Sequence, residues 1–157
     1  DEALSGADGH TMGGDITINR AAEFVKATTM GGDIDVAEIN GWIEANTMGG
    51  DIKVTMVGGT DGDRHVELES MGGTIELTVP SGLAMDIEVE IQLSDDDDGD
   101  EFEIISDFEL DIETESSSSE RRWRSSREVV ATGRTGNGAN KIIIRTVNGD
   151  VILREGR

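Results

Sequence analysis

The sequence predicts an all-β chain, built as a parallel β-solenoid or β-roll with two strands in each coil of about 18 residues. Three observations lead to this class. A Met-Gly-Gly tripeptide recurs at Met12, Met30 and Met48, so that successive copies are equally spaced. Apolar and polar residues alternate on both sides of each tripeptide. The 21 glycines against a single proline suit many tight turns between short strands.

Each 18-residue unit is predicted to hold two short strands and two turns. Alternation with period two places one face of a strand inward and the other in water. Stacked units align like positions about 4.8 Å apart, so the apolar residues form two inward columns. The column after the turns comprises Ile16, Ile18, Ile34, Val36, Ile52, Val54, Ile75 and Leu77. The column before the methionines comprises Val25, Ala27, Ile43, Ala45, Val66 and Leu68.

The repeat extends beyond its third copy. A fourth copy, at Met71, follows Met48 after a longer interval, and the glycine-rich segment 58–63 explains the extra length as a loop inserted at one corner. A fifth copy, Thr-Val-Asn-Gly-Asp-Val at 146–151, follows near the C-terminus. We expect this copy to align with the earlier ones and to close the same stack. Glycine suits these turns because it permits positive φ and close backbone approach.

The 157 residues are predicted to form one domain, 1–157, with a change of style in its middle. Residues 1–80 hold the regular coils. Residues 81–115 are expected to hold two long strands, from Met85 to Leu93 and from Phe102 to Ile112, which pair as a hairpin or continue as wider coils. An acidic loop joins them. Residues 116–128 have the composition of an exposed, flexible Ser/Arg excursion, and 129–157 are predicted as closing strands.

The composition excludes several classes of function. A formal net charge of −21 argues against nucleic acid and against anionic membrane surfaces as partners. The acid-rich, lysine-poor balance fits a salt-adapted (halophilic) organism, although a GC-rich genome would also deplete lysine. The absence of cysteine excludes disulfides and thiolate sites, and no apolar run is long enough to span a bilayer. A start at Asp1 without an initiator methionine favours an extracellular protein after signal-peptide removal.

Several motifs resemble the DUF4097 family of adhesin-like bacterial and archaeal β-repeat proteins. They are the Thr-Val-Asn-Gly-Asp-Val turn at 146–151, the repeated Gly-Asp-Ile turns, and Val-Pro-Ser-Gly at 79–82 before a long strand. The resemblance covers most of the chain except the acidic loop and the Ser/Arg excursion. It implies a β-solenoid that is usually exported or surface-associated and has no established enzyme activity, and it transfers no functional residues. Met-Gly-Gly departs from the family's usual small-polar turn.

Two groups of aspartates are candidate cation sites. Asp96, Asp98 and Asp100 alternate as the oxygen ligands of Ca²⁺ sites do, without the glycine and closing glutamate of such a loop, so a solvated charge run is the competing interpretation. Ca²⁺ is the one cofactor considered. The aspartate that follows each Gly-Gly forms a second column, which either lines a row of cations or caps its own turn; we expect the cap. That column comprises Asp15, Asp33 and Asp51.

No catalytic constellation is apparent, and we predict that the chain is not an enzyme. His10 and His65 lie far apart in the sequence and are interpreted as surface residues, and no nucleophile elbow accompanies the serines. The four methionines of the repeats either pack along an edge of the core or face outward as an apolar stripe fit for association. We expect packing. These methionines are Met12, Met30, Met48 and Met71.

The function expected from the sequence is non-enzymatic. Open solenoid ends present unpaired strand edges, so we expect an extracellular or surface structural protein that self-associates through its ends into a fibre or surface assembly. One basic cluster is either a mobile loop or a docking element for an acidic face of another copy. The alternative is a monomeric adhesin-like module that binds a carbohydrate or protein ligand, against which the scarcity of exposed aromatic residues argues. The basic cluster comprises Arg121, Arg122, Trp123, Arg124 and Arg127.

Overall fold

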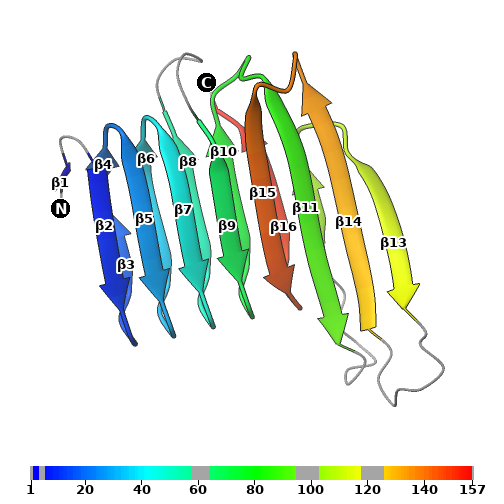
Figure 1. The fold of residues 1–157 in the computed structure, drawn as a ribbon, viewed down its shortest axis with the longest axis horizontal. Coiled ribbons are helices and arrows are strands. Elements are labelled where there is room, and N and C mark those ends of the chain that lie inside the picture. The colour runs from blue at the N-terminus through cyan, green and yellow to red at the C-terminus, as the bar shows by residue number, and fades with distance from the viewer. Residues whose placement is uncertain (1, 4–5, 58–63, 95–102, 118–125, 157) are drawn as a thin grey trace.

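The chain folds into two facing β-sheets, which confirms the all-β class (Figure 1). The computed structural model describes residues 2–3, 6–57, 64–94, 103–117 and 126–156. Sheet A contains β1 (Glu2–Ala3), β3 (Ile16–Ile18), β4 (Arg20–Ala21), β6 (Ile34–Ile39), β8 (Ile52–Met56), β10 (Ile75–Val79), β12 (Ile104–Ser106) and β16 (Val151–Glu155). Sheet B contains β2 (Gly6–Thr11), β5 (Phe24–Thr29), β7 (Trp42–Thr47), β9 (Val66–Ser70), β11 (Met85–Ser94), β13 (Asp111–Ser117), β14 (Ser126–Thr135) and β15 (Asn140–Val147).

In the repeats, the chain alternates between the sheets and each strand pairs in parallel with the equivalent strand of the next unit. Val25 of β5 lies opposite Ile43 of β7, and Ile34 of β6 lies opposite Ile52 of β8. Both registers equal the 18-residue period, so the repeat in the sequence is a repeat in space. Both predicted columns line the core between the sheets: their members are buried except Ile16, which is partly buried.

The fifth turn aligns with the fourth, as predicted, but it does not close the stack. Ile142 of β15 lies opposite Val66, and Val151 of β16 lies opposite Ile75. However, β15 also pairs with β11, and β16 also pairs with β12. β15 therefore lies in the middle of sheet B (Figure 1), and β16 lies inside sheet A, between β10 and the edge strand β12. The expectation of closing strands over 129–157 is wrong in this respect.

Beyond β15 the pairing in sheet B becomes mixed, so a parallel coil through the whole chain is not confirmed. The first long strand predicted is present as β11, which pairs antiparallel with β14, and β14 pairs antiparallel with β13. The prediction of a second long strand is wrong, because this part of the chain forms two strands, β12 in sheet A and then β13 in sheet B. The Ser106 hydroxyl turns the chain between them by accepting the Phe108 N–H and donating to the Phe108 carbonyl, both at 3.0 Å.

A buried hydroxyl in each unit holds the Met-Gly-Gly corner together. The Thr47 Oγ1 donates to the Gly32 carbonyl of the preceding unit at 2.9 Å and accepts the N–H of Gly50 in its own unit at 3.2 Å. Thr29 and Ser70 make the same pair of bonds in their units, and Thr146 donates to the Gly73 carbonyl. These residues are at most 3% exposed, so the hydroxyls satisfy backbone groups that water cannot reach.

Replacing Thr47 by valine tests this hydroxyl ladder. The side chain keeps its shape but leaves a buried carbonyl and a buried N–H without this partner, so we expect the free energy of unfolding to fall by about 1.5 kcal/mol. Thr28→Val on the half-exposed outer face is the matched control and should change stability by less than about 0.5 kcal/mol. Urea denaturation of both variants measures the difference. Equal stabilities would contradict a structural role for the hydroxyl.

A carboxylate ladder runs along the other side of the same corner. The Asp15 Oδ1 accepts the N–H of Asp33 at 3.0 Å, and the Asp33 Oδ1 accepts the N–H of Asp51 at 2.8 Å. The bonds join one unit to the next, so the expectation that each aspartate caps its own turn is wrong. Asp51 continues the ladder to the N–H of Thr74, and Asp150 bonds to the N–H of Glu103.

The two glycines of each corner have different surroundings. From the second unit onward, a Cβ on the second glycine would overlap the carbonyl of the preceding unit, as at Gly50, where it would meet the Gly32 carbonyl. A Cβ on the first glycine, as at Gly49, would meet nothing within 4 Å. Positive φ is not the reason for either, because in the five turns it occurs at Asn148 alone (52°). Close approach therefore requires the second glycine, whereas the fold does not require the first.

At the opposite corner, Arg64 connects four segments although it is only 4% exposed. Its guanidinium donates to the Asn40 Oδ1 at 2.6 Å and to the Val57 carbonyl at 2.9 Å. Its backbone N–H donates to the Asn140 Oδ1 at 3.0 Å, and the Asn140 amide donates to the Ala84 carbonyl at 3.0 Å. This network joins the repeats to β15 and to the start of β11.

No helix in the described part of the chain has the length and apolarity to cross a membrane.

Candidate functional site

The methionines of the repeats lie on the outside of the molecule, which corrects the expectation that they pack on the core. Strand alternation gives the reason. Thr29 points inward to make its hydrogen bonds, so the next residue, Met30, must point outward. The exposed fractions are 76% for Met12, 47% for Met30, 53% for Met48 and 52% for Met71. We call these four residues the methionine ridge.

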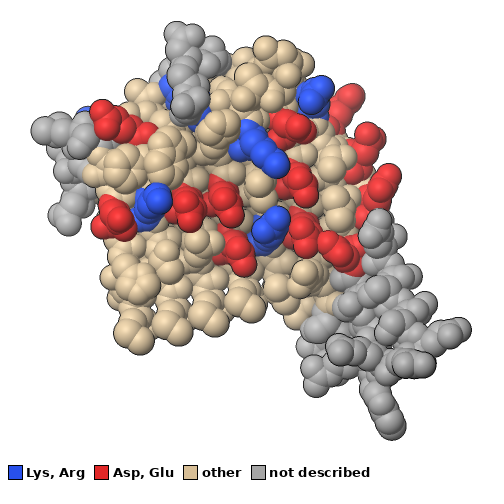
Figure 2. Space-filling model, in the orientation of Figure 1, with Lys and Arg blue, Asp and Glu red and all other residues tan. Residues whose placement is uncertain are grey.

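The methionine ridge runs straight across the ends of four neighbouring strands, β2, β5, β7 and β9. Because parallel strands are about 4.8 Å apart, the ridge is about 15 Å long. The side chains beside it on sheet B are uncharged over the first three units, namely His10, Thr28 and Asn46. Figure 2 shows Asp, Glu, Lys and Arg interspersed over the middle of this face, whereas the margin where these four strands end shows uncharged residues in this view.

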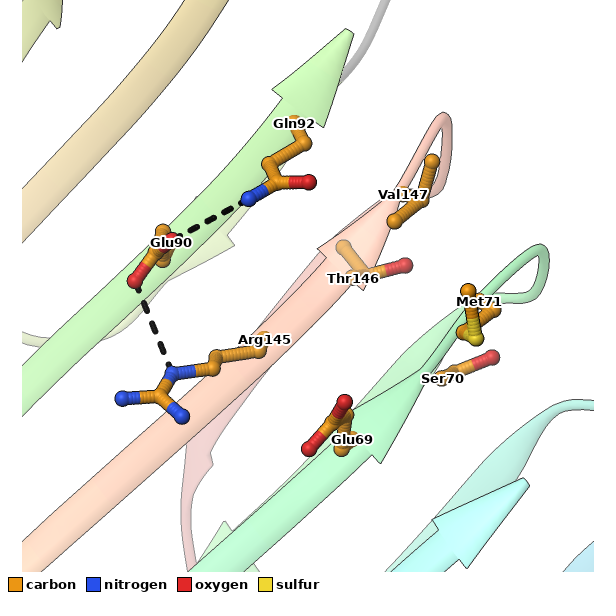
Figure 3. A pocket seen from close by; sticks show the side chains of 8 residues that line it. All are labelled: Glu69, Ser70, Met71, Glu90, Gln92, Arg145, Thr146 and Val147. Carbon is orange, nitrogen blue, oxygen red and sulfur yellow. Dashed lines mark hydrogen bonds and ion pairs between the residues drawn. The ribbon is translucent and has the colours of Figure 1, made fainter. Parts of the chain in front are cut away.

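The ridge ends at a small hollow of about 120 Å³ between β9, β15 and β11 (Figure 3). Met71 and Val147 lie at its margin. They are neighbours at the ends of adjacent strands, because Thr146 pairs with Ser70 and each of the two residues is the next one along the chain. The other side of the hollow is polar: Arg145 Nε lies 3.5 Å from a carboxylate oxygen of Glu90. An apolar group that entered this hollow from outside the molecule would therefore meet walls on several sides.

A row of aromatic residues crosses the same face of sheet B at the other end of the strands. Phe24 and Trp42, one repeat period apart, lie side by side on β5 and β7 with ring centroids 5.2 Å apart and ring planes 17° from parallel. A Cβ at Gly6 on the next strand would overlap the Phe24 ring, so that glycine leaves room for it. Lys26 Nζ lies 5.6 Å from the centroid of the Trp42 ring. Phe24 and Trp42 are both half-buried, so each keeps a face or edge in water.

Beyond Trp42 the row opens into a second hollow of about 270 Å³, which we call the aromatic hollow. Trp42 and Ile143 provide apolar walls, from β7 and β15. The His65 Nδ1 accepts the backbone N–H of Lys141 at 3.2 Å, which leaves the proton of a neutral imidazole on Nε2. The remaining lining residues are Ile43, Glu44, Val66, Glu67 and Lys141.

The residues predicted as sites have two different outcomes. Asp96, Asp98 and Asp100 lie outside the described residues, as do Arg121, Arg122, Trp123 and Arg124. Arg127 lies in β14, where its backbone pairs with Leu93 and Ser116, so this end of the predicted excursion 116–128 is strand. Within the described residues, no group of three or more His, Asp or Glu is arranged to hold a metal ion.

The aromatic row and the aromatic hollow are not among the features predicted from the sequence. The signal was the repeat spacing itself. Trp42 follows Phe24 by the 18-residue period, and His65 follows Trp42 by the same longer interval that separates Met48 from Met71. Equal positions in successive units lie side by side, so these residues form one row. Comparisons of the chain with models of protein families, with curated proteins and with solved structures gave no match.

Proposed function

We propose that this protein is a non-enzymatic structural protein of the cell exterior that self-associates through the methionine ridge. The parallel units form a β-solenoid in this proposal, and the extracellular location is the one that the resemblance to the DUF4097 family implies. The observation that carries the proposal is the row of four exposed methionines at successive units. The contact surface in this proposal is the ridge, whereas the sequence led us to expect the open solenoid ends.

Nothing in the fold requires methionine at these positions. Six large hydrophobic side chains are exposed among the described residues, and four of them form the ridge. The first glycine of each corner, which follows the methionine, also has no steric reason to lack a side chain. Together they make a flat apolar strip, and contiguous exposed apolar surface is typical of association sites. Methionine suits such a surface because its flexible thioether adapts to the facing side chains.

Charge favours the ridge over the edge strand β13 as the contact. Two copies that each carry a net charge of −21 repel, so they approach most easily where neither presents acidic side chains. The outer edge strand β13 presents Asp111 and Glu113. The ridge is flanked on its sheet B side by the uncharged His10, Thr28 and Asn46, and on its other side the carboxylates of Asp15, Asp33 and Asp51 each accept a backbone N–H of the next unit.

A two-fold arrangement fits the ridge best. If two ridges pack antiparallel, Met12 of one copy meets the hollow beside Met71 and Val147 of the other, and the same contact recurs at the other end. Such an isologous contact closes on itself, so it produces a dimer. Met12 is the most exposed residue of the ridge, and the 120 Å³ hollow offers walls for its side chain.

Sedimentation velocity on a double variant, Met30→Lys with Met48→Lys, tests the proposal. In molar salt, which screens the acidic surfaces, we expect the wild type to dimerise and the variant to remain monomeric, with affinity reduced at least about a hundredfold. A matched control adds the same two charges on the outer face of sheet A, Thr17→Lys with Asn19→Lys, and should still dimerise. A monomeric wild type, or assembly that is unchanged in the ridge variant, overturns the proposal.

A further inference from the structure

The aromatic hollow has the chemistry of a ligand site that the methionine ridge does not use. It lies at the opposite end of the strands, and its walls come from β7, the residues around the start of β9, and β15. Trp42 has Phe24 stacked beside it on the β5 side, while the hollow opens toward β9 and β15. The indole thus has Phe24 on one side and the Lys26 ammonium 5.6 Å from its centroid, and the part of the half-buried ring that borders the hollow faces solvent. A solvent-facing aromatic ring is a surface against which an apolar group can pack.

The polar groups around the Trp42 ring include both hydrogen-bond donors and hydrogen-bond acceptors. Glu44 and Glu67 supply carboxylate oxygens, which accept hydrogen bonds. Lys141 supplies an ammonium group, and His65 supplies the Nε2–H that its bond to the Lys141 backbone leaves free to donate. A ligand that stacks on Trp42 and carries several hydroxyl groups can pair with all of them, since each hydroxyl both donates and accepts.

The charges around the hollow have both signs. Its lining includes Glu44, Glu67 and Lys141, and Lys26, which lies over the Trp42 ring, pairs across the strands with Asp8 and Glu44. Groups of both signs suit a neutral ligand whose hydroxyls donate and accept hydrogen bonds. The volume of about 270 Å³ is near the lower end of ligand pockets, which accommodates one or two sugar rings.

We propose that the aromatic hollow binds a neutral saccharide, with one face of a pyranose ring on Trp42 and the ring hydroxyls paired with Glu44, Glu67, His65 and Lys141. A pyranose matches the site because its C–H face is apolar while its hydroxyls point outward around the ring. The proposal does not depend on self-association, because no residue of the methionine ridge lines this hollow.

Titration with a panel of neutral oligosaccharides at millimolar concentration, followed by tryptophan fluorescence and by saturation-transfer NMR, tests the site. We expect at least one neutral saccharide to bind. Trp42→Ala should weaken binding about tenfold or more, and Trp42→Phe should weaken it less, because it keeps an aromatic wall. Glu67→Gln and Lys141→Met change exposed side chains, so they leave the fold intact and should each weaken binding several-fold.

Two comparisons separate this site from the rest of the molecule. Glu113→Gln on β13 and the ridge variant Met30→Lys with Met48→Lys should bind the saccharide as the wild type does. Absence of binding by every neutral saccharide overturns the proposal, and so does a preference for amines such as choline over neutral sugars. Equal binding by the wild type, Glu67→Gln and Lys141→Met also overturns it, whether or not Trp42→Ala folds.

Discussion

Replacing Gly50 by alanine is expected to lower the free energy of unfolding by about 3 kcal/mol. The added Cβ would overlap the carbonyl of Gly32 in the preceding unit and would crowd the Asp33 carboxylate. The Gly32 carbonyl accepts the Thr47 hydroxyl, and the Asp33 carboxylate accepts the Asp51 N–H. Movement of either group would therefore disturb both ladders at once.

Gly49→Ala is the matched control for this substitution. It adds the same methyl group one residue away, where no atom lies within 4 Å, and its φ is not positive. We expect its stability to remain within about 0.5 kcal/mol of the wild type, because removing a glycine also restricts the unfolded chain. Guanidinium denaturation of both variants provides the measurement. If Gly50→Ala proved as stable as Gly49→Ala, the close approach between units would not exist as described.

Replacing Arg64 by methionine is expected to cost about 3 kcal/mol of stability. The variant keeps an apolar stem of similar length but loses the bonds from the guanidinium to Asn40 and to the Val57 carbonyl. Hydrogen bonds from a charged donor are stronger than neutral ones, and this donor is almost completely buried.

Arg154→Met serves as the control for Arg64→Met. The Arg154 side chain is 57% exposed and lies 3.6 Å from a Glu76 carboxylate oxygen, a surface pair that contributes little. We expect its thermal unfolding midpoint to match that of the wild type, and that of Arg64→Met to fall by several degrees. An Arg64→Met protein as stable as the control would show that the corner network contributes nothing to the fold.

The sequence was sufficient to predict the parts of the fold that depend on periodicity. The 18-residue repeat period predicts the register of β5 with β7 and of β6 with β8. Alternation with period two predicts which residues line the core. The fifth turn was placed in register by its motif alone. These features follow from local pattern because each unit contacts the units next to it.

The parts that were missed depend on contacts between segments distant in sequence. A strand pattern cannot indicate which edge it will join, so nothing local places β15 between β9 and β11. The long apolar alternation from Phe102 to Ile112 conceals the turn at Ser106, which a single hydroxyl produces. The outward position of the methionines could be predicted from the sequence, because Met30 has the opposite parity to the inward residues Val25, Ala27 and Thr29. Packing on the core was expected instead because methionine is usually buried in proteins.

The internal positions of β15 and β16 determine the order in which the two sheets can be completed. The units from β2 to β10 can stack as they are synthesised, because each pairs with the unit made just before it. β11, β13 and β14 are made next, yet they have no neighbour among those units until β15 arrives to pair with both β9 and β11. The two halves of the sheets therefore join last, through contacts of long sequence separation, which form slowly. Until β15 and β16 are made, β9 and β10 on one side and β11 on the other lack their final partners, so we expect the nascent chain to be most exposed to mispairing at that stage.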